Sequence, residues 1–483
     1  MFTRSSPAAH GGPVPRTHFS HVRSRSRPRT TVRPLALLLT VTALVGTAPR
    51  AGAQPPSQQP AVSSARLDSL VARALAASPG LRAARARMEA ARARVGPAGL
   101  RPDPMLMAGV QNFPVSEPGF SDFMTMKMVG VGQTVPYPGK LALRRQAARR
   151  EAEAAQAALA GVARQVARDV RGAYYELAFL DQALDVVGRN QRVLGDFVRV
   201  AEARYSVGRT GAPGAGLQDV LRARVEATRL AEQAVALTEQ RRAALARLNA
   251  ALDQPTSTPV AAPRVPERVA RAAVADSAGR VRFASAALGA RAADSPLPPL
   301  RALEETALRE SPVLREQEAG IAAQVARAEL ARRDYLPDVD VSVQYGQRRG
   351  LSDMVTATVS VPLPVQKRRR QDLQVAEARA ELAALEAERA ARRNEIRAEV
   401  ARLHSELERQ RTQLALYVKA IIPQGRAALT SATASYQVGR VEFLTVLDNQ
   451  ATLFTYETEY FRTLSDFATT LAELERVVGR EIL

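Results

Sequence analysis

Methionine is the side chain in this sequence whose type and spacing suggest metal chemistry. Six of the eight methionines fall in or beside segments whose pattern predicts β-strands, at Met105, Met107, Met124, Met126, Met128 and Met354. Thioether sulfurs are soft ligands that suit Cu(I) or Ag(I). Methionine is also an ordinary apolar residue for a lipid-facing surface or a subunit interface. Both interpretations stay open, so the sequence assigns no metal ligand and no cofactor.

Other residues that support catalysis or metal binding are scarce. The chain has no cysteine, which excludes disulfides, thiolate metal sites and a lipid-modified N-terminal cysteine. Three of the four histidines, at positions 10, 18 and 21, precede the expected mature chain, which leaves His404. No nucleophile with a base, no phosphate-binding loop and no acid pair in a cleft can be assembled. The sequence therefore predicts that the protein is not an enzyme.

The N-terminal segment predicts export. Residues 1–67 contain no aspartate or glutamate and many arginines, followed by an apolar run over 35–45 and the small residues Ala51-Gly52-Ala53. This order indicates a secretory signal over 1–53 with cleavage near Ala53, and the apolar run is too short to span a bilayer. The alternative is a disordered basic tail that binds nucleic acid. The net charge of +20 does not favour that alternative, because the arginines beyond the leader mostly alternate with glutamate on helices.

The sequence contains a duplicated architecture. Three landmarks recur in order: ALAASPGLR (74–82) with ALRESPVLR (307–315), TVPYPG (134–139) with SVPLPV (360–365), and RYSVGR (204–209) with SYQVGR (435–440). Recurrence in a fixed order is typical of repeated structural units. Each copy predicts a helix, two short strands, a very long helix, a tight turn and a return helix. A left-handed helix cap is expected at the turn glycines, Gly208 and Gly439. We assign the copies to 54–253 and 299–483, with an irregular insertion over 254–298.

The long helices predict antiparallel hairpins. The first copy has no proline over 139–204, a length of roughly 100 Å as a helix, and its return helix spans about 217–252. The second copy repeats this over about 366–435 and 442–478, with a bend expected at Pro423. Apolar residues spaced by three and four predict supercoiled seams. A coiled-coil rod would explain these helices equally well but would leave the strands unexplained.

Strict alternation marks the strands. Valines at 339, 341 and 343 alternate with polar residues over about 338–347, and a similar strand covers 354–362. Less regular strands cover about 105–114 and 123–135. Strands of this length with one apolar face suit an outer-membrane barrel wall, flanked by aromatic residues near the strand ends (Phe113, Phe120, Phe123, Tyr137 and Tyr335).

Four strands cannot close a barrel, and an open sheet in lipid would leave edge groups unpaired. Protomers must therefore pool strands: two would give eight with a filled interior, and three would give twelve with room for a passage. The alternative is a small soluble β-domain that caps a coiled coil.

Taken together, the chain resembles the TolC family of outer-membrane efflux channels over essentially the whole mature sequence. The resemblance lies in the duplicated hairpin, the Val-Pro-x-Pro strand exits, and the Tyr-x-Val-Gly turns followed by LQDVLRARVE and FLTVLDNQATLF. It implies an α+β membrane protein that forms a homotrimer, with a 12-stranded outer-membrane β-barrel continued by a long periplasmic α-helical barrel. The segment GQTVPYPGKLALRR also resembles the branch that serves heavy-metal resistance-nodulation-division pumps.

The resemblance also implies a periplasmic gate. Family members carry aspartates just beyond the second hairpin turn that ring and constrict the entrance, and Asp448 matches one such position, whereas Thr445 stands at the other. In the first copy Asp219 aligns with Thr445, and Glu442 could add charge at the same level. A ring of like carboxylates from three subunits would attract cations and repel anions. The alternative role for Asp219 and Glu442 is a helix N-terminal charge.

The hairpin turns are the other implied site. The resemblance suggests that residues there latch neighbouring hairpins and contact a periplasmic adaptor, which assigns Tyr205, Gly208, Arg209, Tyr436, Gly439 and Arg440 to this role. A tyrosine at a helical seam is otherwise a packing residue.

The implied function is that of a passive exit duct for small molecules or metal ions, located in the outer membrane with a periplasmic extension. Its partners would be outer-membrane lipid, a periplasmic adaptor and an inner-membrane pump of the resistance-nodulation-division type, with no nucleic acid. The alternatives are a periplasmic coiled-coil adaptor or scaffold protein, which would bury the strand valines in its own core, and the outer-membrane duct of a type I protein secretion system.

Overall fold

The computed structural model describes residues 67–115, 120, 122–208, 217–260, 263–274 and 297–483. The expected signal segment 1–53, Arg209 and part of the insertion 254–298 lie outside these residues. Within the described part of the chain, no helix combines the length and the apolar character needed to cross a membrane.

The two copies give matching series of elements. The first contains α1 (Leu67–Ala77), α2 (Pro79–Ala98), β1 (Met105–Gln111), β2 (Met126–Val135), α3 (Lys140–Gly208) and α4 (Leu217–Ala251). The second contains α6 (Leu300–Glu310), α7 (Pro312–Arg333), β3 (Val339–Arg348), β4 (Met354–Ser360), α8 (Gln371–Leu416), a π-helical turn (Tyr417–Ile421), α9 (Ile422–Gln437) and α10 (Phe443–Val478). The recurring Ser-Pro pair separates the first two helices of each copy, because proline favours the first turn of a helix.

The first pair of strands is shorter than the pattern predicts. We expected strands over 105–114 and 123–135, whereas β1 ends at Gln111 and β2 begins at Met126. Asn112 has a left-handed φ of 55°, and its carbonyl accepts a hydrogen bond from the Thr125 hydroxyl at 3.0 Å. These contacts end the pairing, so Met124 lies outside the strands.

The second long helix is interrupted. One helix was expected over 366–435, but α8 begins at Gln371, and a π-helical turn separates it from α9 immediately before Pro423. The N–H of Ile422 donates to the carbonyl of Tyr417, five residues earlier. Proline has no N–H and its ring clashes with the carbonyl four residues before it, so the wider turn lets the helix continue.

The insertion is not wholly irregular. Helix α5 (Glu267–Val274) lies within 254–298 and packs against α8 and α10. Its buried residues Val269, Ala272 and Ala273 share one face, which is the spacing of an amphipathic helix. Nε of the buried Arg411 on α8 donates to the carbonyl of Ala272 at 3.1 Å.

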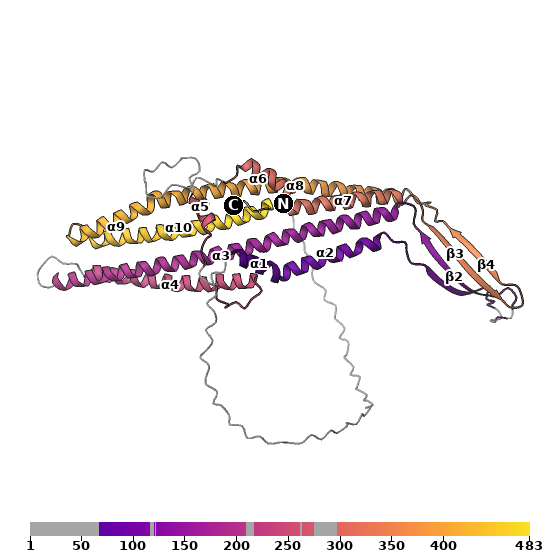
Figure 1. Cartoon of the computed structure of the whole chain (residues 1–483), viewed down its shortest axis with the longest axis horizontal. Helices are drawn as coiled ribbons and strands as arrows, with labels where there is room; N and C mark the ends of the chain where they lie inside the picture. Colours follow the sequence, from indigo (N-terminus) through magenta and orange to yellow (C-terminus); the bar gives the residue numbers. More distant parts are fainter. Residues whose placement is uncertain (1–66, 116–119, 121, 209–216, 261–262, 275–296) are drawn as a thin grey trace, which may run out of the picture. The chain divides into compact units, whose positions relative to one another are not determined.

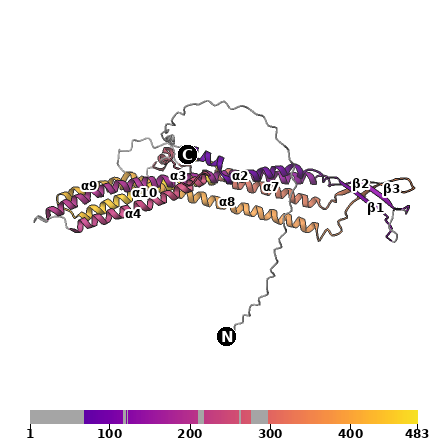
Figure 2. The same ribbon diagram turned by 90° about the horizontal axis from the view of Figure 1, so that it is seen from below.

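Two apolar clusters hold the helices together. Helix α3 lies beside α2, α4, α7 and α10, and its neighbours can be followed in Figures 1 and 2. Midway along α3 is the central cluster, which includes Val170, Leu177, Leu180, Leu248, Leu403, Leu407, Phe467 and Leu474. Near the hairpin turns is the tip cluster, which consists of Leu194, Ala201, Val220, Ala223, Leu230, Ala432, Tyr436, Phe443, Val446 and Leu447.

The strands form one antiparallel sheet in the order β1-β2-β3-β4, so β1 and β4 are its edges. Its register divides the side chains between two faces, because successive residues of a strand point to opposite sides. The apolar face carries Leu106, Ala108, Val110, Val129, Val131, Val135, Val339, Val341, Val343, Tyr345, Val355, Ala357 and Val359, with Lys127, Gln133 and Gln347.

The polar face carries the glycines and most of the hydrogen-bonding side chains of the sheet. Among them are Gln111, Thr134, Asp340, Ser342, Gln344, Arg348, Thr356, Thr358 and Ser360. On this face the Thr134 hydroxyl donates to Asp340 at 2.5 Å.

Candidate functional site

The second hairpin turn has the geometry that its sequence predicts. Gly439 has a left-handed φ of 77°, which glycine adopts without a steric penalty. The N–H of Arg440 donates to the carbonyl of Ser435 at 2.9 Å, and the N–H of Gly439 donates to that of Tyr436 at 3.0 Å. The turn therefore closes the end of α9 and directs the chain into α10. In the first copy, α3 ends at Gly208, and the residues of the corresponding turn, 209–216, lie outside the described part of the chain.

Aromatic side chains pack beneath this turn. Phe443 is only 1% exposed, and its ring centroid lies 5.3 Å from that of Tyr436 and 6.5 Å from that of Phe197. Tyr205 is half-buried and packs against the same tip cluster from α3. The two predicted latch tyrosines therefore contribute to the cluster that joins both hairpins within one protomer.

The three predicted gate acids lie at the beginnings of α4 and α10. Val220 and Val446 belong to the tip cluster, so the structure brings together the helix turns that carry Asp219 and Glu442. Glu442 and Asp448 are exposed and Asp219 is half-buried.

None of these acids forms an ion pair with another described residue. The Glu442 side chain makes no capping hydrogen bond to α10, although its carbonyl accepts from the N–H of Thr445 at 3.2 Å. The exposed side chains of Glu442 and Asp448 therefore contact solvent in the protomer.

One buried polar contact was missed at the sequence level. The side-chain amide of Gln450 on α10 donates to the side-chain oxygen of Asn190 on α3, and both residues are buried. The amide nitrogen of Asn190 in turn donates to the carbonyl of Val186 at 2.9 Å. The available signal was that Gln450 continues the buried series of Phe443, Val446 and Leu447 at helical spacing. An amide at such a position needs a buried partner.

Ion pairs join the C-terminal end of α10 to α3. Arg171 on α3 donates to Glu475 at 2.5 Å and to Glu481 at 2.6 Å, and Glu475 accepts the N–H of Ile482 at 3.0 Å. Burial raises the pKa of Glu475, partly offset by the Ile482 hydrogen bond and the Arg171 charge. The hydrogen bond from Arg171 lowers the pKa of Glu481. This network ties the C-terminal residues to the middle of α3.

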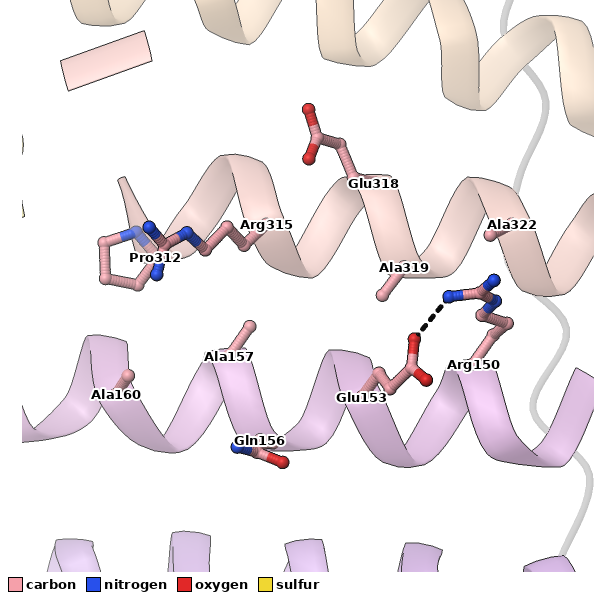
Figure 3. A pocket seen from close by; sticks show the side chains of 10 residues that line it. All are labelled: Arg150, Glu153, Gln156, Ala157, Ala160, Pro312, Arg315, Glu318, Ala319 and Ala322. Carbon is pink, nitrogen blue, oxygen red and sulfur yellow. Dashed lines mark hydrogen bonds and ion pairs between the residues drawn. The ribbon is translucent and has the colours of Figure 1, made fainter. Parts of the chain in front are cut away.

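A groove of about 460 Å³ lies between α3 and α7 (Figure 3). Alanines from both helices line it, at positions 157, 160, 319 and 322. Arg150 and Glu153 form an ion pair at 2.7 Å along one wall, and Arg315 and Glu318 come from α7. Small side chains explain the empty volume, and the groove contains no nucleophile, so it offers no catalytic arrangement.

No group of three or more histidine, cysteine, aspartate or glutamate side chains that could hold a metal ion occurs among the described residues. Methionine sulfurs are a separate kind of ligand.

Comparison with known proteins gives a family for this architecture. A sequence model of the family described as outer membrane efflux protein matches residues 70–254 and 303–480, well over half of the chain. The cobalt-zinc-cadmium resistance protein CzcC of Cupriavidus metallidurans is 28% identical in an alignment over 184 residues that covers 36% of this chain and 44% of that protein. The match thus spans less than half of this relative's length.

Solved structures show a similar fold. The outer-membrane channel OprN superimposes with a TM-score of 0.69 at 19% identity, over 86% of this chain and 89% of that chain. The outer membrane protein VceC from Vibrio cholerae gives a TM-score of 0.69 at 19% identity, over 87% and 97% of the two chains.

Proposed function

Because the chain belongs to the outer membrane efflux protein family, we propose that three copies form a passive exit duct through an outer membrane. Each protomer would contribute one four-stranded sheet to a shared barrel and its helical hairpins to a periplasmic tunnel.

The observation that carries this proposal is the apolar face of the sheet. Val341, Val343 and Tyr345 on its third strand remain exposed, with Val343 at 50%, so no described part of the protomer covers them. In water such a face would favour aggregation, whereas in a bilayer it lies in its preferred solvent. The periplasmic adaptor alternative requires these valines to be buried in the protomer's own core, so their exposure argues against it.

The sheet edges support the trimer. Strands β1 and β4 each pair on one side only, and unpaired backbone groups are costly in lipid. If β4 of one protomer pairs with β1 of the next, three sheets of four strands close into a barrel of twelve with no free edge.

An apolar stripe on α4 supports the same assembly. Leu217, Leu221 and Val225 follow one another at intervals of four residues and are exposed, Leu221 by 52% and Val225 by 68%. Their spacing places them on one side of the helix, away from the buried Val220 and Ala223. In a closed helical tunnel this side would pack against the neighbouring protomer.

The likeness to a cobalt-zinc-cadmium resistance protein favours metal ions as the exported substrates, with small molecules and secreted proteins as the alternatives. A passive duct needs an energy source elsewhere. We therefore place an inner-membrane pump, of the resistance-nodulation-division type, and a periplasmic adaptor among its partners, with lipid around the barrel. The protein would reach the outer membrane after cleavage of its signal segment near Ala53.

At the tip, the proposed gate consists of Asp448, Asp219 and Glu442 from each protomer. Their lack of ion pairs with described residues suits a ring that attracts cations. Tyr205, Gly208, Arg209, Tyr436, Gly439 and Arg440 would latch the hairpins or contact the adaptor. The buried positions of Tyr436 and, in part, Tyr205 favour a supporting role for the tyrosines, and exposed Arg440 is the better placed for a direct contact.

The test is single-channel conductance of the purified mature protein in a planar bilayer, with its oligomeric mass measured in the same detergent. We expect a trimer with discrete, cation-preferring conductance steps. A detergent-independent monomer or dimer without conductance would overturn the duct and revive the adaptor. Unchanged conductance and unchanged adaptor-dependent resistance after substitution of Tyr436, Arg440 and Asp448 would reject the tip assignments alone.

A further inference from the structure

The strand methionines all lie on one face of the sheet. The register places Met105 and Met107 of β1, Met126 and Met128 of β2, and Met354 of β4 on the polar face. No methionine lies on the apolar face, where valine predominates. Conversely, every apolar side chain on the polar face apart from glycine is a methionine. A residue used only for its apolar character would be expected on the other face, so this distribution needs another explanation.

Glycines let the methionine side chains lie flat across the strands. The methyl carbon of Met107 would be 3.1 Å from a Cβ added at Gly132, and the sulfur of Met126 would be 3.5 Å from one added at Gly346. Gly346 pairs with Met128 on one side and with Met354 on the other. The Met126 side chain therefore lies over Gly346, between the paired positions of Met128 and Met354.

The methionines of β1 lie next to those of β2. Met107 pairs with Gly130, so Met128 is its diagonal neighbour on the same face, a distance that long side chains span. The side-chain amide of Gln344 approaches the Met107 sulfur at 4.0 Å. Met107, Met126 and Met128 are half-buried and Met105 and Met354 exposed, so none of the five is enclosed in the protomer. We call these five residues the methionine patch.

We propose that the methionine patch is a binding site for soft monovalent metal ions, Cu(I) or Ag(I), on the inner wall of the barrel. Thioether ligands select such ions over divalent ions that prefer imidazole or carboxylate. Neutral thioethers add no charge, so they bind weakly enough for an ion to leave, as conduction through a duct requires. The inference rests on the proposed function, because only a closed barrel makes the polar face an inner wall.

The test uses the purified mature trimer in detergent, titrated anaerobically with Cu(I) against a chromogenic Cu(I) chelator. The patch variant Met107→Leu/Met126→Leu/Met128→Leu keeps apolar volume while removing three sulfurs. The matched control is Met88→Leu/Met124→Leu, which changes one methionine in α2 and one outside the strands. Both variants and the native protein are also examined by single-channel conductance.

We expect the native protein and the control to bind Cu(I), and the patch variant to bind at least about tenfold more weakly, the loss that removal of even an outer-shell partner produces. Equal Cu(I) affinity in native and patch proteins would overturn the proposal. So would a native trimer that conducts but does not bind Cu(I), and that result would leave the duct intact. A native protein that is neither trimeric nor conducting would overturn the duct itself, and with it the placement of the patch.

Discussion

Helices α3 and α10 meet in two places, and their polar groups are used differently in each. Beside the central cluster, Arg171 is fully engaged by Glu475 and Glu481, and Arg168 donates to Glu473 at 2.6 Å. At the tip cluster α3 and α10 are joined by aromatic rings, one amide pair and the Arg189–Glu457 ion pair at 3.7 Å, while the three predicted gate acids have no ionic partner among the described residues. The central contact thus pairs its charges within the protomer, whereas the three gate acids take no part in the ion pairs of the described residues.

This difference predicts that the central region is the stable part and the tip the part that can move. Mutations should separate the two, from core deletions with large effects to charge neutralisation at the gate with almost none.

The largest effect is expected from matched phenylalanine deletions. Phe467 in the central cluster is 0% exposed and Phe443 in the tip cluster 1%, so either change to alanine should cost about 3–5 kcal/mol. We expect Phe467→Ala to lower amide-exchange protection throughout α3 and α10. Phe443→Ala should lower it only near the hairpin turns, from about Asn190 to the end of α3 and from the start of α10 to about Gln450. Measurement is by hydrogen exchange of the trimer, with the exposed Val438→Ala as the control. Global loss of protection in Phe443→Ala would mean that the two clusters unfold together.

The helices and strands of both regions could be predicted because their signals are local. Alternating valines marked β3, and Tyr-x-Val-Gly marked the left-handed turn at Gly439. Their ends depended on particular contacts that no pattern contains, such as the left-handed Asn112 after β1 and the five-residue backbone bond at Tyr417.

Partnerships across the chain were harder to foresee. Asn190 and Gln450 lie 260 residues apart in the sequence. A side-chain amide in a helix is usually exposed to solvent, so neither residue suggests a buried partner. The common face of the methionines follows from strand register, which the sequence of one strand does not specify. The resemblance identifies the gate acids, whereas their lack of ionic partners among the described residues depends on the fold around the hairpin turns.

The amide pair tests how the two regions are joined. Gln450→Leu should leave the side-chain oxygen of Asn190 buried without this partner and cost about 1–3 kcal/mol. The double change Asn190→Leu/Gln450→Leu should recover most of that loss, because both polar groups are then gone. Thermal unfolding and a double-mutant cycle measure the coupling. If the double variant loses as much as the sum of the single changes, the pair makes no specific contribution to the tip contact.

An intermediate effect is expected from acidification of the central region. Burial would raise the pKa of Glu473, but hydrogen bonds and charge from Arg476 and Arg168 outweigh it and hold the pKa below the usual 4.5. The stabilisation from this group is therefore complete above pH 4.5 and is lost as the pH falls through the lower folded-state value.

The measurement is the difference in melting temperature between native protein and Glu473→Gln, taken at several pH values. At neutral pH we expect the native protein to be more stable than Glu473→Gln by about 1 kcal/mol, a value between those of surface and buried ion pairs. This difference should shrink in acid. The exposed Glu239→Gln on α4 serves as the control, because it removes only a solvent-exposed ion pair with Arg242. If the difference in melting temperature grew on acidification, burial and not the two arginines would determine the direction of the Glu473 pKa shift.

The smallest effect on stability, and the sharpest on conduction, is expected at the gate. Asp448 is exposed and has no described ionic partner, so Asp448→Asn should change the free energy of unfolding by less than about 0.5 kcal/mol. In a trimer the same change removes three like charges from one ring, so the preference for cations should fall, measured as a shift of the reversal potential in a salt gradient. Glu459→Gln is the matched control, because it neutralises another exposed acid of α10 three helical turns further along. Loss of stability without a change in reversal potential would mean that Asp448 supports the tip fold, and the two contacts of α3 with α10 would then differ less than their charges suggest.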